Sequence, residues 1–214
     1  MKIDTNVELA KGLAVRVMVD SIWRSTQIEG LDMQHTSVWN LVVNDVSDGL
    51  NFKEILFCYN MQKAWNFLLE NVGEKNNIAL LREFNRICGH SLFQEAGAIR
   101  TRGIHITGCK WIPPIPQHGT IIDDLRSIND IYDATERAIE LLCYVARNQL
   151  FIDGNKRVAQ LVFNKVLIEN GIGFLHFTND EQVRKLMNLL VDYYESGDNK
   201  DLSEYLQLEC IYRV

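Results

Sequence analysis

The chain has 214 residues, of which 47% are hydrophobic and 23% charged, a balance typical of a globular protein with one substantial core. A formal net charge of −6 argues against nucleic acid as a partner, because phosphate backbones are bound by concentrated basic surfaces. The N-terminus has no apolar leader, and no stretch approaches the roughly 18 uninterrupted apolar residues of a membrane span. We therefore expect a cytoplasmic protein that does not bind membranes.

Apolar residues recur every three to five positions along most of the chain, which predicts amphipathic helices. The first of these begins near residue 7, and Gly30 ends it, so that the N-terminal helical region covers about residues 7–30. The expected helices are residues 7–27, 37–45, 53–71, 78–93, 120–131, 135–148, 155–170, 180–195 and 200–208.

The pattern changes over about residues 97–116, which we call the flap segment. Apolar and threonine residues alternate there, glycines interrupt them at Gly103 and Gly108, and the three prolines of the chain follow at 113, 114 and 116. These features predict a short β-hairpin. The fold class is thus mainly α with a small β element, in a single domain over residues 1–214, since no repeat or linker is evident.

The cysteines are five in number and widely spaced, without a C-x-x-C pair or a nearby histidine cluster. This spacing predicts reduced thiols that serve mostly as packing residues rather than as metal ligands. A cysteine nucleophile would need a histidine brought beside it by the fold, which the sequence leaves open.

The segment from Gln149 to Arg157 separates two predicted helices and has the composition of an anion site. Gly154 permits backbone conformations closed to other residues, and the next amides belong to the unpaired first turn of a helix. Lys156 and Arg157 add positive charge, while Asp153 offers the kind of oxygen ligand that Mg²⁺ uses beside polyphosphates. This combination suits a nucleotide, although the same residues also form ordinary turns and solvated surfaces. Neither a Walker A loop nor a Rossmann fingerprint is present.

This segment resembles the signature of the Fic (Fido) family, H-x-F-x-[DE]-G-N-[GK]-R-x-x-R, at the start of a central helix. The resemblance implies that Asp153 binds magnesium, that Gly154 to Lys156 form an anion hole for ATP, and that Arg157 helps to hold the phosphates. The residues that match in order and spacing are Phe151, Asp153, Gly154, Asn155, Lys156 and Arg157.

Two further segments resemble the same family. Ser25-Thr-Gln-Ile-Glu29-Gly30 is similar to its inhibitory motif, [ST]-x-x-x-E-[GN], in the class that carries it N-terminal to the Fic domain. The resemblance implies that Glu29 occupies the γ-phosphate position and blocks productive ATP binding. The flap segment is similar to the hairpin on which family members bind an extended stretch of the target protein, with Ile104, His105 and Ile106 as the expected contacts.

The chain departs from the signature at two positions. Gln149 stands where the family has the histidine that takes a proton from the target hydroxyl, and a carboxamide cannot act as a general base. Gln160 stands where many members have the last arginine, the partner of the inhibitory glutamate, so Glu29 is expected to hydrogen-bond only to an amide. Two changes together favour natural divergence over a single engineered substitution. His105 is a weak candidate to replace the missing histidine.

The resemblance implies a Fic-type protein related to adenylyltransferases, which transfer AMP from Mg-ATP to a protein hydroxyl (AMPylation), with activity weakened or abolished by Gln149. One alternative is a pseudoenzyme that only holds a partner on the flap segment. Another is a Doc-like kinase, because the Doc branch lacks the final arginine. The sequence leaves a homo-oligomer open.

Overall fold

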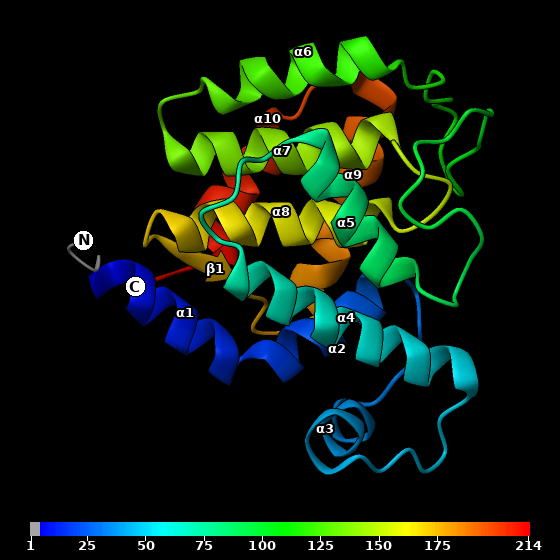
Figure 1. Cartoon of the computed structure of the whole chain (residues 1–214), viewed down its shortest axis with the longest axis vertical. Helices are drawn as coiled ribbons and strands as arrows, with labels where there is room; N and C mark the ends of the chain where they lie inside the picture. The colour runs from blue at the N-terminus through cyan, green and yellow to red at the C-terminus, as the bar shows by residue number, and fades with distance from the viewer. Residues whose placement is uncertain (1–4) are drawn as a thin grey trace.

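The computed structural model describes residues 5–214, which form a mainly helical fold around a central helix, α8 (Figure 1). The N-terminal half contains α1 (Thr5–Arg16), α2 (Met18–Ile28), α3 (His35–Asn44), α4 (Phe52–Glu70) and α5 (Ile78–Gly89). The second half contains α6 (His118–Asn129), α7 (Ala134–Asn148), α8 (Asn155–Glu169), β1 (Gly173–Leu175), α9 (Asp180–Ser196), α10 (Lys200–Tyr205), the π-helical turn η1 (Leu206–Cys210) and β2 (Ile211–Arg213).

Helix α8 is the core of the molecule. Every residue of α8 except Lys156 and Glu169 is buried, and the helix packs against α7, α5, α4, α1 and β1. In Figure 1, α7 runs alongside α8 and α6 covers the far side of α7. A helix buried on nearly all sides has little freedom to move, so its first turn is a rigid platform for the segment that precedes it.

Side-chain caps explain where several helices begin. Asn51 accepts hydrogen bonds from the amides of Lys53 and Glu54, and Glu54 reaches back to the Asn51 amide, which completes a capping box at α4. Asn77, Asp133 and Asn179 cap α5, α7 and α9 in the simpler way. The helix bounds expected from periodicity are therefore confirmed to within a few residues for most of the chain.

The N-terminal helical region differs from the expectation. It is interrupted at Val17 (φ −100°, ψ 7°), which separates α1 from α2. Helix α1 packs on α8 and β1, whereas α2 packs on α3, α4 and α9. The break lets each half bury its apolar side against different neighbours, and an unbroken helix over residues 7–27 would not.

The flap segment also differs from the expectation, because it contains no strand. The small antiparallel sheet lies elsewhere: β1 pairs with β2 in the register Gly173 with Arg213 and Phe174 with Tyr212. The reason lies in Arg100, a residue that is 1% exposed. Its guanidinium donates hydrogen bonds to carbonyls at both ends of the flap segment and at the end of α7. These carbonyls face one buried side chain instead of a partner strand, and prolines 113 and 114 have no amide to donate.

Among the described residues, no helix combines the length and the apolarity that a bilayer crossing requires.

Candidate functional site

The segment between α7 and α8 has a fixed backbone that is held from both sides. Gln149 ends α7 in the left-handed conformation (φ 49°), and Gly154 begins α8 with φ 81°. A β-carbon at Gly154 would lie 2.9 Å from Asn85 Nδ2, so only glycine fits. The Asn155 side chain accepts from the Phe151 amide at 2.9 Å and donates to the Phe151 carbonyl at 2.8 Å.

Asn85 on α5 is a supporting residue that sequence reasoning missed. Its Nδ2 donates to the Asp153 carbonyl at 2.7 Å, and its Oδ1 accepts from the Gly97 amide at 2.8 Å. The side chain is fully buried, so it joins the signature segment to the start of the flap segment. An asparagine inside an amphipathic helix gives no sequence signal for such a role.

Gln149 has a structural place in the segment. Its Nε2 donates to the Ala146 carbonyl at 2.6 Å, and its Oε1 accepts from Asn155 Nδ2 at 2.9 Å. Its own carbonyl accepts from Arg100 Nε at 2.5 Å. Both ends of the carboxamide are therefore occupied by contacts within the protein.

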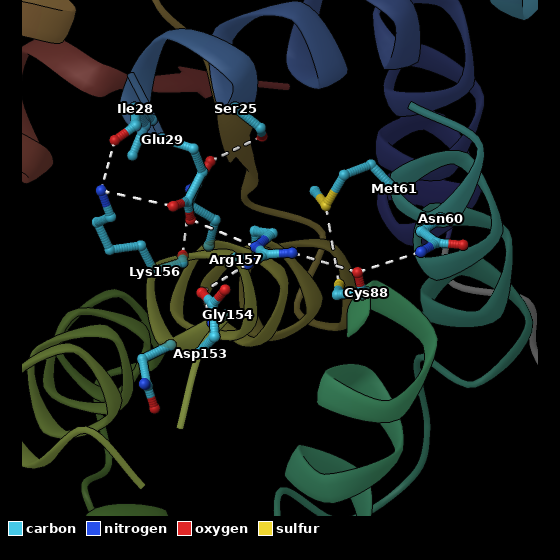
Figure 2. Close-up of polar contacts among 12 residues, drawn as sticks. Ser25, Ile28, Glu29, Asn60, Met61, Cys88, Asp153, Gly154, Lys156 and Arg157 are labelled. Carbon is cyan, nitrogen blue, oxygen red and sulfur yellow. Dashed lines mark hydrogen bonds and ion pairs between the residues drawn. The ribbon is translucent and has the colours of Figure 1, made fainter. Parts of the chain in front are cut away.

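Arg157 is the cation at the centre of the site, and it is 4% exposed (Figure 2). Its Nη2 donates to Asp153 Oδ1 at 2.8 Å, and its Nη1 donates to the Cys88 carbonyl at 3.2 Å. Its third nitrogen, Nε, lies 3.4 Å from Glu29 Oε1, within ion-pair distance but outside hydrogen-bond geometry. The guanidinium is held beside the first turn of α8 because it is buried and lies close to Asp153 and farther from Glu29.

Glu29 follows the last residue of α2 and points at the start of α8 (Figure 2). Besides Arg157, it faces Lys156, whose Nζ lies 3.6 Å from Glu29 Oε2 and donates to the Ile28 carbonyl at 2.6 Å. The expectation that Glu29 could only hydrogen-bond to the Gln160 amide is therefore wrong. Lys156 and Arg157 neutralise the glutamate, because both project from the first turn of α8 towards the end of α2.

Gln160 contacts Ser25, and not Glu29, of the N-terminal motif. Ser25 Oγ lies 2.9 Å from Gln160 Oε1 and 2.9 Å from the Ser21 carbonyl, so its single proton serves one acceptor at a time. Gln160 Nε2 donates to the Lys156 carbonyl at 3.1 Å. The contact between Ser25 and Gln160 is buried and joins α2 to α8.

Replacement of Ser25 by alanine is expected to destabilise the protein by about 1–3 kcal/mol, because a buried Gln160 oxygen loses its donor. Urea unfolding measures the change. Ser127→Ala is the matched control, since the Ser127 hydroxyl makes the same contact to the carbonyl four residues earlier but lies on the exposed side of α6. A loss at Ser25 no larger than at Ser127 would show that the α2–α8 contact contributes nothing.

Most predicted site residues meet around one cleft of about 220 Å³. Its opposite wall, missed by sequence reasoning, is formed by Met187, Val191 and Tyr194 of α9, which lie on one side of that helix. Four predicted residues do not line the cleft: Ser25, Gly30, Ile104 and Gln160. Arg157 does not line it either, but its side chain contacts Glu29, which does. The sequence-predicted residues that do line it are Glu29, His105, Ile106, Gln149, Asp153, Gly154, Asn155 and Lys156.

The comparison with known families agrees with this geometry. Residues 76–167, which include α5, the flap segment, α7 and most of α8, match the model of the Fic/DOC family. This stretch is a Fic/DOC family sequence, and it covers a little under half of the chain. No curated protein sequence matches the chain.

Solved structures show the same fold at low sequence identity. Fic-1 from C. elegans superposes with a TM-score of 0.74 at 20% identity, covering 96% of this chain and 63% of that one. A Fic domain containing signaling protein from Bacteroides thetaiotaomicron gives 0.73 at 17% identity, covering 90% and 81%. A Fic family protein from Desulfovibrio desulfuricans gives 0.65 at 14% identity, covering 91% and 66%. The chain thus spans less than two thirds of the length of the C. elegans chain.

The Asp153 carboxylate of the signature segment is half-exposed and offers oxygen atoms of the kind that magnesium binds. The Asp153 side chain is 53% exposed, and its Oδ1 accepts from the Gly154 amide at 2.5 Å and from Arg157. Mg²⁺ is commonly held by one or two carboxylates together with substrate phosphates and water. In residues 5–214, no three His, Cys, Asp or Glu side chains gather into a metal site of their own.

None of the five cysteines lines the cleft, so none supplies a nucleophile there. Cys88, whose carbonyl binds Arg157, is buried, and burial raises the pKa of its thiol to about 12. Burial also raises the pKa of Cys58 and Cys143 to about 12. Thiols with such pKa values stay protonated at neutral pH, which is typical of packing residues.

Proposed function

We propose that this Fic protein binds ATP with Mg²⁺ in the cleft at the first turn of α8. The observation that carries the proposal is that Lys156, Arg157 and Asp153 gather at this turn, with Glu29 as the internal anion that neutralises the two cations. Amides at the start of a helix, beside two cations, bind phosphate groups. Asp153 would hold the magnesium ion, and Met187 and Val191 of α9 would contact the remainder of the nucleotide.

We further propose that the site is built for AMP transfer, in which a target hydroxyl attacks the α-phosphorus of ATP and pyrophosphate leaves. Binding, orientation and charge stabilisation supply much of the catalysis of phosphoryl and nucleotidyl transfer, and Asp153, Lys156 and Arg157 retain those functions. The Gln149 carboxamide cannot act as a general acid or base at neutral pH, and it is held by Ala146 and Asn155. Transfer is therefore expected to be slow or absent.

The target protein is proposed to bind along the flap segment. Residues 104–106 lie beside the cleft, and without a partner strand their backbone can pair with an extended stretch of another protein. His105 is exposed at the cleft, so it would contact the target or the nucleotide rather than support the fold.

One observation favours a second candidate, a protein that holds a partner without catalysing transfer. Both polar ends of the Gln149 side chain make hydrogen bonds inside the protein, so this position now serves the structure of the segment. In this case the flap segment would bind the partner, and the cleft would bind a nucleotide without turnover or bind none.

Replacement of Glu29 by alanine is expected to tighten the binding of Mg-ATP at least tenfold. Glu29 pairs with Lys156 and Arg157, and its negative charge would repel the phosphates of the nucleotide. Like charges held close together cost several kcal/mol. Since about 1.4 kcal/mol corresponds to a tenfold change in affinity, removal of the carboxylate should strengthen binding at least tenfold. Isothermal calorimetry with ATP, ADP and AMP, with and without Mg²⁺, measures the change. Asp32→Asn is the control, because it removes a nearby exposed acid outside the cleft. The absence of nucleotide binding to both the wild-type and the Glu29→Ala protein would refute the nucleotide site.

A further inference from the structure

Three buried polar atoms without a hydrogen-bond partner belong to the cleft and its charged end. They are Glu29 Oε1, Arg157 Nε and the hydroxyl of Tyr194. In the part of the chain that the structure describes, only two other buried side-chain atoms share this condition, Asn76 Oδ1 and Trp111 Nε1, and neither residue lines the cleft. Native proteins pair nearly all their buried polar groups, so a group of unpaired ones marks a place where something else binds.

Glu29 does not satisfy the two donors around it. Its Oε1 lies 3.4 Å from Arg157 Nε without hydrogen-bond geometry, and its Oε2 lies 3.6 Å from Lys156 Nζ. Figure 2 shows the carboxylate reaching down from the end of α2 towards the two cations. The Glu29 carboxylate therefore neutralises the charges of Lys156 and Arg157 but leaves the Arg157 Nε–H group without a hydrogen bond.

Tyr194 completes the group from the opposite wall. It is 3% exposed, lines the cleft, and follows Met187 and Val191 on the same side of α9. Burial, and after it the charge of Glu29, raise the pKa of its phenol above the ordinary value. The phenol therefore remains protonated at neutral pH and offers an O–H donor near Glu29. Gln160 does not take this part, because it lies outside the cleft and its Nε2 donates to the Lys156 carbonyl.

We propose that the Tyr194 hydroxyl and Arg157 Nε together bind the terminal phosphate of a nucleoside di- or triphosphate, in the place now held by the Glu29 carboxylate. A terminal phosphate has three oxygens and can accept from both donors at once, which the carboxylate does not do. The inference rests on the proposed nucleotide site and makes Tyr194 a specificity residue: its hydroxyl would favour ligands with a phosphate beyond the first over a monophosphate.

The test compares Tyr194→Phe with Tyr193→Phe, both in the Glu29→Ala protein, so that the glutamate does not compete. Tyr193 is the matched control, because it is the adjacent tyrosine of α9 but does not line the cleft. Binding affinities are measured by calorimetry with Mg-ATP, inorganic tripolyphosphate and AMP. Tyr194→Phe is expected to lower the affinity for Mg-ATP and for tripolyphosphate by roughly 10- to 100-fold. The affinity for AMP should change less than about twofold, and Tyr193→Phe should change none of them.

An unchanged affinity for ATP in Tyr194→Phe would overturn the inference while leaving the nucleotide site intact. Equal losses for ATP and AMP would also overturn it, since the hydroxyl would then contact the nucleoside part or the first phosphate. If neither ATP nor tripolyphosphate binds any of the variants, the proposed function fails as well.

A second measurement needs no ligand. Tyr194→Phe removes an unpaired buried hydroxyl, so in otherwise wild-type protein it is expected to raise the Tm by roughly 2–4 °C. A lowered Tm would show that the hydroxyl has a partner in the free protein, which would contradict the premise.

Discussion

Gln149→His, combined with Glu29→Ala, is expected to raise the rate of AMP transfer by about 10²- to 10⁴-fold, the range that a general base contributes. An imidazole can accept the proton of a target hydroxyl at neutral pH, which a carboxamide cannot do. Position 149 is in the left-handed conformation with φ 49°, and histidine is among the residues that adopt it most readily. The backbone of the segment therefore does not need to change.

The measurement is incorporation of label into the protein itself or into added protein, from ATP labelled at the α or the γ position. Gln149→Asn with Glu29→Ala is the matched control, because asparagine tolerates the same backbone and provides no base. Label from the α position supports AMP transfer, whereas label from the γ position alone indicates a Doc-like kinase. If nucleotide binds but neither label is incorporated, the partner-holding alternative is correct.

Arg100→Met is expected to lower the free energy of unfolding by about 3–5 kcal/mol, one of the largest effects available in this chain. The guanidinium donates to the carbonyls of Arg102, Pro113, Pro114, Asn148 and Gln149, and a methionine leaves all five acceptors, most of them partly buried, without this donor. Urea or guanidinium unfolding measures the loss.

Arg102→Met is the control, because that side chain is 64% exposed and makes a single distant ion pair, 3.7 Å from Glu95. Its loss should be below about 0.5 kcal/mol. Equal small effects at positions 100 and 102 would mean that the flap segment is held by other contacts. Since Arg100 also holds the Gln149 carbonyl, Arg100→Met should weaken nucleotide binding beyond its effect on stability.

Periodicity predicted most helices because an apolar stripe on a helix has to face the core, as it does on α5 and α7. The break at Val17 could not be predicted, because apolar spacing continues through it and no glycine or proline marks it. The flap segment was predicted as a hairpin because its apolar and threonine residues alternate, but its carbonyls face one buried arginine instead of a partner strand. Strands of three residues, such as β1 and β2, are too short to give a periodic signal.

The cleft was predicted on one side only. The signature segment and Glu29 were found because short motifs specify local chemistry. The α9 wall was missed because Met187, Val191 and Tyr194 have the spacing of ordinary core residues, and a hydroxyl without a partner is visible only in three dimensions. The partners of Glu29 depend on how α2 crosses α8, which no local pattern encodes.

The burial of α8 has a thermodynamic consequence for the binding of the nucleotide, which differs from that expected for the target protein on the flap segment. Its first turn is fixed by packing on several helices before any ligand arrives, so a nucleotide would lose its own freedom but would order little of the protein. The flap segment has no strand partner, so an extended peptide that pairs with it would lose much of its own conformational freedom on binding. Nucleotide binding should therefore carry only a small entropic penalty from the protein. The affinity for the target protein should depend strongly on how rigid its binding segment is before it binds.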